Sequence, residues 1–211
     1  MERTRFLDLS TQTFTSVAKD IGELKTEIIR KSIHFLIALS PSMAAINRPL
    51  TVLFLMAGTL GYTVMESLRL SGVKVPVISS LTGMASRSRD IGRFVLGPVT
   101  LGMGALLALL LYPSPAAAIA IYALAFGDGF ASLVGKFFGK WRPAFLCGKS
   151  VEGSLACFAA VLISAYTVCG NMRIAMIAAV TAMLVEALPL EDYDNMVLPI
   201  TVGLIVQIAG L

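Results

Sequence analysis

Seven apolar segments follow one another along the chain, and no other feature of the sequence constrains its fold as much. Hydrophobic residues make up 56% of the chain and charged residues 14%, whereas about a quarter of a soluble domain is charged. This composition excludes a soluble domain, a disordered chain and a disulfide scaffold. A transmembrane helix needs about 20 residues. We therefore expect an all-α, polytopic membrane protein of about seven transmembrane helices, at residues 33–46, 50–65, 94–112, 116–138, 155–168, 172–185 and 196–211.

The placement of charge predicts the orientation of these spans. Of the 17 Lys and Arg, all except Arg48 and Arg173 fall in the N-terminal region or in the alternate connections near 66–93, 127–152 and 186–195. The positive-inside rule therefore places the N-terminus in the cytoplasm and the C-terminus outside, which requires an odd number of spans. All 13 Asp and Glu lie on the same predicted side. We expect a multi-pass integral membrane protein, in the inner membrane if the source is bacterial.

The first part of the chain predicts a surface helix. From about Phe14, apolar residues recur at helical spacing and charged residues fill the opposite face, as in a helix that lies on a membrane. We expect residues 1–26 to form a cytoplasmic or interfacial segment and residues 27–211 to form one transmembrane domain. The net charge of +4 suits anionic lipid headgroups, so we expect membrane lipids and no nucleic acid as partners. Scattered Gly and Ala suit packing within one chain, so an oligomer is possible but not indicated.

A polar face marks the entry to the first span. Glu27, Arg30, Lys31 and His34 follow at helical spacing and share one side of a helix. A salt-bridged helix end explains Arg30 and Lys31 by itself. A salt-bridged helix end explains His34 less well, because this residue, the only histidine of the chain, lies inside an apolar run. His34 therefore favours a functional role for this side of the helix.

A carboxylate interrupts the fourth apolar segment. Gly127, Asp128 and Gly129 follow a wholly apolar stretch, which descends about 16 Å if it is helical, close to half of the hydrocarbon core. A charged carboxylate at that depth costs several kcal/mol, so Asp128 must face a polar cavity and meet a cation. The two glycines permit close approach of another backbone or of a ligand.

The residues before the fifth segment favour phosphate binding. The triplet Gly148, Lys149 and Ser150 is not the loop of the nucleotide-binding folds, because that motif needs a glycine where this chain has Pro143. The triplet does precede a predicted helix, whose N-terminal N–H groups attract phosphate. Glu152 supplies an acid or a metal ligand, and Asp128 with Glu152 would suit Mg²⁺ on a nucleotide.

The remaining polar clusters of the sequence each allow a structural and a functional interpretation. Glu66 and Arg69 form either a plain ion pair or part of a site, and the basic run 86–93 is either an anchor for anionic lipid or a phosphate clamp. Glu186 and the pair Asp194 and Asn195 precede the last segment, where Asp-Asn serves as a metal or ribose site or as a helix cap.

Taken together, these motifs resemble those of the dolichol kinase, phytol kinase and CTP-dependent diacylglycerol kinase family of polytopic membrane lipid kinases. The matching residues are Glu27-x-x-Arg30-Lys31-x-x-His34, Gly127-Asp128-x-x-Ala131-x-x-x-Gly135-x-x-Phe138-Gly139, Gly148-Lys149-Ser150-x-Glu152-Gly153-Ser154, and Glu186 with Asp194-Asn195-x-x-x-Pro199. The resemblance implies transfer of the γ-phosphate of CTP, with a divalent metal, to a polyprenol, a phytol-like alcohol or diacylglycerol at the cytoplasmic face.

The residue roles expected on this basis fall into three groups. The catalytic residues are Asp128, Lys149, Glu152, Glu27 and His34, of which Glu27 or His34 orients or deprotonates the hydroxyl. The nucleotide is held by Arg30, Lys31, Gly127, Gly129, Gly148, Ser150 and Asn195. Mg²⁺ is held by Asp128, Glu152 and Asp194.

Three other functions remain as alternatives. Phosphatidate cytidylyltransferases, which make a CDP-lipid, are distantly similar through the Gly-Asp-x-x-Ala block, but their later arginine- and aspartate-rich signature is missing here. A small transporter would use Asp128 as a buried carboxylate, although its polar path should reach both faces. A lipid-anchoring scaffold would leave Asp128 without a purpose.

Overall fold

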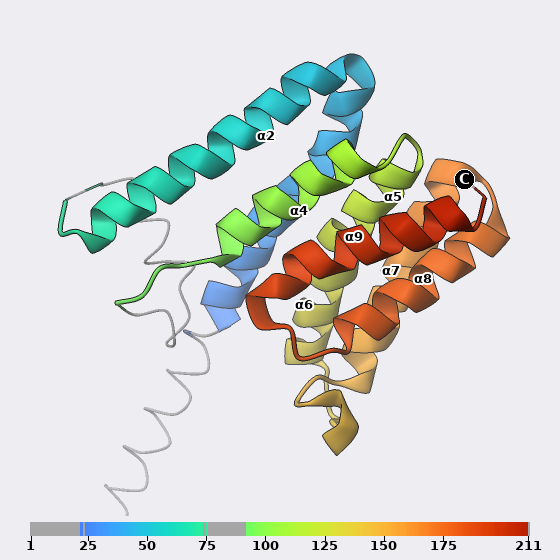
Figure 1. The fold of residues 1–211 in the computed structure, drawn as a ribbon. Coiled ribbons are helices and arrows are strands. Elements are labelled where there is room, and N and C mark those ends of the chain that lie inside the picture. The colour runs from blue at the N-terminus through green and yellow to red at the C-terminus, as the bar shows by residue number, and fades with distance from the viewer. Residues whose placement is uncertain (1–21, 23, 74, 76–91, 211) are drawn as a thin grey trace, which may run out of the picture.

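The structure is a computed structural model that describes residues 22, 24–73, 75 and 92–210, and all regular structure in this part of the chain is helical (Figure 1). This confirms the all-α prediction for the described residues. Most of the predicted surface helix and of the basic run 86–93 lies outside them. The first described helix covers residues 24–36. The elements after it are η1 (Ile37–Leu39), α2 (Ser40–Leu70), α4 (Gly97–Leu111), α5 (Ala116–Tyr122), η3 (Ala123–Asp128), α6 (Gly129–Phe137), η4 (Ala144–Leu146), α7 (Val151–Cys169), α8 (Met172–Glu186), η5 (Glu191–Tyr193) and α9 (Asp194–Ile208).

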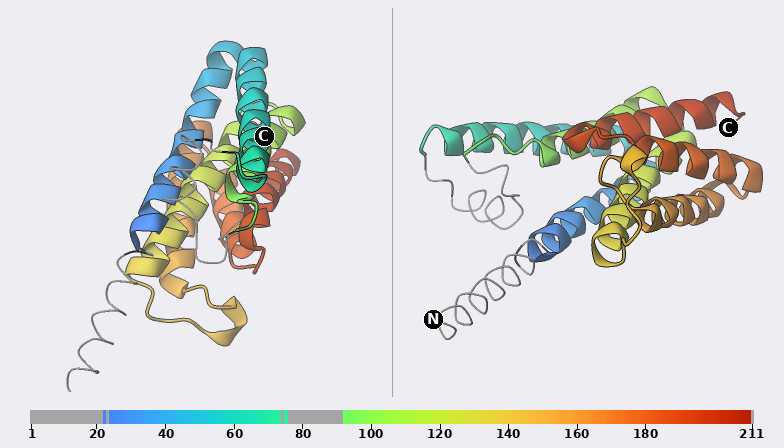
Figure 2. Two further views of the ribbon diagram at one scale, coloured as in Figure 1. Left: turned by 90° about the vertical axis from the view of Figure 1, so that its left-hand side faces the viewer. Right: turned by 90° about the horizontal axis from the view of Figure 1, so that it is seen from below.

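A sharp bend at Asn47 divides α2 into two arms. Asn47 has non-helical dihedral angles, φ −153° and ψ 94°, and Pro49 follows two residues later, where it has no N–H to donate. The side-chain oxygen of Asn47 accepts a hydrogen bond from the N–H of Leu50 at 3.0 Å, so Asn47 caps the second arm. The arms fold back on each other (Figures 1 and 2), and the predicted segments 33–46 and 50–65 lie on either side of the bend.

The central rod of the molecule is a continuous helical stretch made of α5, η3 and α6. The carboxylate that interrupts the apolar segment does not end the helix, because a π-helical turn at Ala123–Asp128 carries the helix through Gly127-Asp128-Gly129. Gly127 and Gly129 serve close packing instead: an added Cβ would lie 2.8 Å from Val161 Cγ2 and 2.5 Å from Phe35 Cε1, respectively. π turns are rare and frequent at functional sites.

The core surrounds this rod. Its fully buried side chains, among them Ile119, Ile121 and Leu124, pack against α4, α7, α8 and α9. The outer arm of α2 packs mainly on α4 and exposes large apolar side chains such as Leu53, Phe54 and Leu60, as a lipid-facing helix does.

Three of the described helices are long and apolar enough to cross a membrane. They cover Leu24–Leu70, which includes the bend at Asn47, Ala116–Phe137 and Val151–Cys169. The structure therefore supports a helical membrane protein. Most described residues of each predicted apolar segment lie in helices. However, α4, α8 and α9 have only 15 residues each, so the count of seven spans and the orientation of the termini stay predictions.

Candidate functional site

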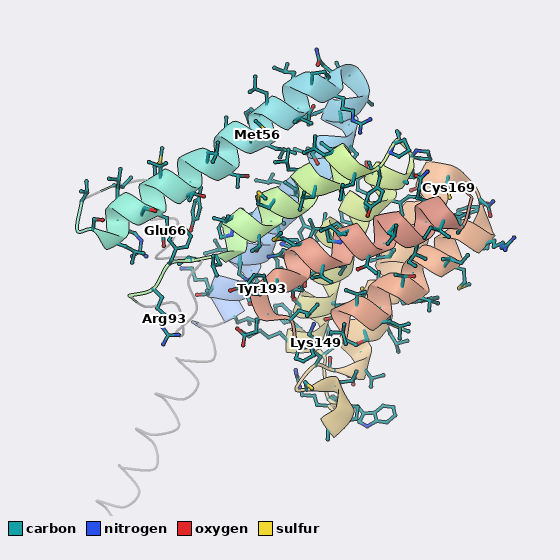
Figure 3. The ribbon with its side chains drawn as sticks, in the orientation of Figure 1. Met56, Glu66, Arg93, Lys149, Cys169 and Tyr193 are labelled. Atoms are coloured by element: carbon teal, nitrogen blue, oxygen red, sulfur yellow. The ribbon has the colours of Figure 1, made fainter. Side chains whose placement is uncertain are left out.

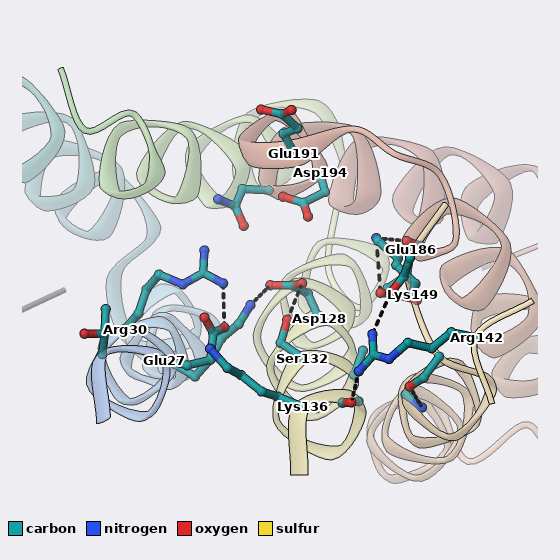
Figure 4. Close-up of a pocket in the computed structure, with 18 of the residues that line it drawn as sticks. Glu27, Arg30, Asp128, Ser132, Lys136, Arg142, Lys149, Glu186, Glu191 and Asp194 are labelled. Atoms are coloured by element: carbon teal, nitrogen blue, oxygen red, sulfur yellow. Dashed lines mark hydrogen bonds and ion pairs between the residues drawn. The ribbon is translucent and has the colours of Figure 1, made fainter. Parts of the chain in front are cut away.

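A polar cavity of about 850 Å³ lies where the ends of several helices meet. Its walls come from the first helix, α6, the start of α7, the end of α8 and the start of α9, and Figure 4 shows charged side chains pointing into it from all of these elements. The lining residues are Gly22, Thr26, Glu27, Arg30, Lys31, Asp128, Ala131, Ser132, Gly135, Lys136, Arg142, Gly148, Lys149, Ser150, Gly153, Glu186, Glu191, Asp194 and Asn195.

An ion pair between Lys31 and Asp128 forms the floor of the cavity. Lys31 Nζ contacts Asp128 Oδ2, and the two residues are 2% and 4% exposed. Ser132, one turn further along α6, lies with its hydroxyl 3.4 Å from Asp128 Oδ1. Buried charges persist in proteins when they are paired and hydrogen-bonded. The cation that balances Asp128 is therefore a lysine on a different helix, 97 residues away in sequence.

His34 lies behind Asp128 and does not line the cavity. Its Nε2 is 2.8 Å from the carbonyl oxygen of Leu124 and 3.2 Å from Asp128 Oδ2. Both neighbours accept hydrogen bonds, so Nε2 carries the proton. Leu124 belongs to the π turn, so His34 ties this turn to the first helix. The geometry suits positioning of Asp128 and leaves His34 without access to a ligand in the cavity.

Arg30 has one hydrogen-bond donor that lacks a partner among the described residues. Its Nη2 donates to Glu27 Oε1 at 2.6 Å, but its Nε is buried and has no partner among the described residues. Buried donors without a partner are rare and call for an explanation such as a bound ligand. Because Arg30 lines the cavity, its free donor provides a place for an anion.

Lys149 and Ser150 immediately precede α7 at one side of the cavity. The hydroxyl of Ser150 caps the helix by accepting the N–H of Gly153 at 3.1 Å. Lys149 Nζ lies 3.1 Å from Glu186 Oε1 and also donates to the backbone carbonyl of Glu186. Gly148 has φ +90°, a conformation that glycine adopts without strain.

Glu152 points away from the cavity. Its carboxylate accepts the backbone N–H of Lys140 at 3.0 Å and that of Trp141 at 3.2 Å. Ser150 caps α7, and the second residue of the helix then faces the preceding loop. The structure brings Asp128, Lys149, Asp194 and Asn195 to one cavity but does not bring Glu152, Gly127 or Gly129 to its lining.

Asp194 and Asn195 cover the cavity from the start of α9. The amide of Asn195 donates to the hydroxyl of Thr100 at 3.0 Å and is thus held by α4. Asp194 faces Asp128 across the cavity (Figure 4), and in the part of the chain that the structure describes its carboxylate forms no hydrogen bond.

Arg142 is a cavity residue that the sequence analysis missed. It donates to the carbonyl oxygens of Gly148 at 2.5 Å and Gly135 at 2.6 Å, and so fastens the loop before α7 to α6. No motif signals this role, because both acceptors are backbone atoms. Lys136 also lines the cavity without having been predicted, and so does Glu191, which belongs to the acidic group before the last apolar segment.

Glu66 and Arg69 lie away from the cavity, as Figure 3 shows for Glu66 and Lys149. Arg69 donates to both carboxylate oxygens of Glu66 at 2.7 Å, and Glu66 also accepts the N–H of Val95 at 3.0 Å. The pair fastens α2 to the segment before α4, which favours the structural interpretation.

The described residues contain no cluster of three or more His, Cys, Asp or Glu side chains that would hold a metal by themselves. Mg²⁺ is commonly held by one or two carboxylates together with waters and the phosphates of a substrate. Asp128 and Asp194 face each other across the cavity and offer two carboxylates for that arrangement. The Oδ2 of Asp128 already contacts Lys31, so a metal ion would use its other oxygen together with Asp194.

Fold and cavity define a helical membrane protein with a charged site between its helices. Among curated proteins, the chain is similar to "Probable phytol kinase 1, chloroplastic" of Oryza sativa subsp. japonica, with 26% identity over 147 residues, or 61% of this chain. The matched region spans about half of that relative, 47% of its length. No protein-family model matches the chain. No solved structure matches it.

Proposed function

We propose that the protein is a membrane kinase that transfers the γ-phosphate of CTP to a lipid alcohol at the cytoplasmic face. The observation that carries this proposal is the cavity itself, which gathers cationic and anionic side chains from five parts of an otherwise apolar chain. The likeness to a probable phytol kinase supports the reaction class. The acceptor is a polyprenol, a phytol-like alcohol or diacylglycerol.

The phosphates of the nucleotide lie along the cationic wall in this proposal. Arg30 donates its free Nε in this proposal. Lys149 and the backbone of Gly148 and Ser150, which precede α7, line the same space. Lys31 contributes positive charge at the floor. Phosphoryl transfer depends mainly on positioning and on neutralisation of charge, and these residues supply both.

Asp128 and Asp194 would hold Mg²⁺, with the phosphates as further ligands. The ion, when bound, neutralises charge that develops on the transferred phosphoryl group. Glu152 is left out of this set because its carboxylate is bound to the loop before α7. Asn195 shapes the roof beside Asp194. If the assignment is right, a chelator abolishes activity and added Mg²⁺ restores it.

Glu27 is the candidate base, since it lines the cavity and His34 does not. The alcohol oxygen attacks the γ-phosphorus, the bond from that phosphorus to the bridging oxygen of the β-phosphate breaks, and CDP leaves. The proton of the alcohol passes to Glu27, which Arg30 holds in place. The lipid product then carries a monophosphate.

Labelled CTP distinguishes the proposal from its rivals. The purified protein, in vesicles that contain candidate alcohols, should move label from the γ-position to lipid and release CDP. Transfer of an α-label, with release of pyrophosphate, would instead show a cytidylyltransferase, and nucleotide-independent flux of a substrate would show a transporter. Lys149→Gln and Asp128→Asn should abolish transfer while the protein remains folded, whereas Arg173→Gln, an exposed charge outside the cavity lining, should retain it.

A further inference from the structure

The connection between α6 and α7 joins the ends of two helices that are each able to cross a membrane. One of these helices ends at Phe137 and the other begins at Val151, so both ends of the connection belong to the same side of the protein. The connection protrudes beyond the helices at that end (Figures 1 and 2). If both helices cross a bilayer, the surface of that bilayer lies close to this loop.

Residues 137–142, which we call the aromatic loop, display three rings outward. Phe137 is 46% exposed, Phe138 is 68% exposed and Trp141 is 65% exposed. The rings of Phe137 and Phe138 lie 6.3 Å apart, so they form one apolar surface. Contiguous exposed apolar surface marks a place of interaction with protein or membrane.

The backbone that carries these rings is fixed. Glu152 accepts the N–H groups of Lys140 and Trp141, and the N–H of Val151 donates to the carbonyl of Trp141 at 3.0 Å. Arg142 binds two backbone carbonyls on either side of the loop. The rings therefore point outward from a braced loop, and they do so without any need for the loop to rearrange.

Positive charge accompanies the rings. Lys140 is exposed and lies between Phe138 and Trp141 in the sequence. The guanidinium of Arg142, which follows, is engaged by the carbonyls of Gly148 and Gly135, so Lys140 is the cation of this loop that faces outward with the rings. Tryptophan and other aromatic rings gather where acyl chains meet headgroups, and nearby lysines reach the phosphate layer. The combination of flat apolar rings with cationic groups complements the surface of an anionic bilayer.

We propose that the aromatic loop docks into the headgroup–acyl boundary of the bilayer and selects anionic lipid there. The three rings lie at the level of the first acyl carbons, and Lys140 contacts lipid phosphate. One Lys near an anionic surface gives a preference of about fivefold for anionic over neutral lipid. This proposal does not depend on the kinase reaction, and its test uses no nucleotide and no lipid alcohol.

Trp141 makes the test direct, because it is the only tryptophan of the chain. The full-length protein is reconstituted in phosphatidylcholine vesicles that contain an equal fraction of acyl-brominated phosphatidylglycerol or acyl-brominated phosphatidylcholine. We expect Trp141 to emit at shorter wavelength than free tryptophan in water. We also expect brominated phosphatidylglycerol to quench it more strongly than brominated phosphatidylcholine does. Lys140→Gln should remove this difference and retain quenching by both lipids.

A second variant serves as a control, with the tryptophan on a helix that faces the acyl chains away from the aromatic loop. Trp141→Phe combined with Phe54→Trp places the only tryptophan on the outer arm of α2, where Phe54 is 65% exposed, and it should be quenched equally by both brominated lipids. Emission of Trp141 as in water, with quenching by iodide and none by brominated lipid, would overturn the proposal and leave the loop to a protein partner. Equal quenching of wild-type Trp141 by the two brominated lipids would also overturn it.

Discussion

The ion pair between Lys31 and Asp128 allows a stability prediction that separates folding from chemistry. Breaking a buried pair by removal of one partner typically costs about 3–5 kcal/mol, because the other charge stays buried and uncompensated. In Lys31→Met, the Asp128 carboxylate keeps His34 Nε2 at 3.2 Å, so we expect the lower end, a loss of about 3 kcal/mol. In Asp128→Leu, Lys31 keeps no hydrogen bond among the described residues, so we expect the upper end, about 5 kcal/mol.

The double variant Lys31→Met/Asp128→Leu removes both charges at once. Replacement of a whole buried pair by apolar residues is often neutral, so its free energy of unfolding should lie within about 1–2 kcal/mol of the wild type. Unfolding of all forms is followed in detergent micelles by far-ultraviolet circular dichroism. Under the proposed function, the double variant is folded and does not phosphorylate lipid, which separates the two roles of the pair.

The control is Ser132→Ala, since Ser132 makes only a 3.4 Å contact with the same carboxylate and should cost no more than about 1 kcal/mol. If the losses in the two single variants simply add up in the double variant, Lys31 and Asp128 are not coupled and the reasoning fails. Wild-type stability of Lys31→Met would equally contradict it, because it would mean that no uncompensated charge remains.

Three other outcomes follow from the structure. Arg30→Lys keeps the charge but loses the free Nε donor, and it should raise the KM for CTP about tenfold with kcat largely kept; an unchanged KM would remove Arg30 from the phosphate site. Gly104→Ala would force a methyl group onto the carbonyl oxygen of Asn195 and should cost about 1–3 kcal/mol in thermal unfolding, whereas Gly61→Ala, with open space around it, should stabilise by about 0.5–1 kcal/mol. Glu152→Ala should speed hydrogen exchange in the loop before α7 and leave phosphorylation nearly unchanged; loss of Mg²⁺-dependent activity would return Glu152 to the metal site.

The sequence was most informative where a single helix carries the information. Helical spacing placed Glu27, Arg30 and Lys31 on one face, and all three line the cavity. The depth argument predicted that Asp128 needs a cation, because a charge inside an apolar segment is costly. It did not identify Lys31 as that cation, since the packing of two helices far apart in sequence is not encoded in local spacing.

The differences between the sequence-based expectations and the cavity have separate physical causes. The sequence groups Glu152 with Asp128 because carboxylate oxygens suit Mg²⁺, but the direction of Glu152 is set by the cap at Ser150 and by two backbone N–H groups of the loop. Arg142 was missed because it binds backbone carbonyls. Gly127 and Gly129 pack against side chains of neighbouring helices, and the sequence alone left open whether a helix, a backbone or a ligand would approach them.

The central rod made of α5, η3 and α6 touches protein on most sides in its middle, with Ile119, Ile121 and Leu124 fully enclosed. The dielectric and steric surroundings of Asp128, at the end of this enclosed stretch, are therefore provided by neighbouring helices rather than by lipid. Water-soluble enzymes keep their reacting groups in such a preorganised interior. The same kind of enclosed interior lies here within a membrane protein. A change of lipid composition should therefore affect the lipid-facing side chains of the outer helices and leave the surroundings of Asp128 unchanged.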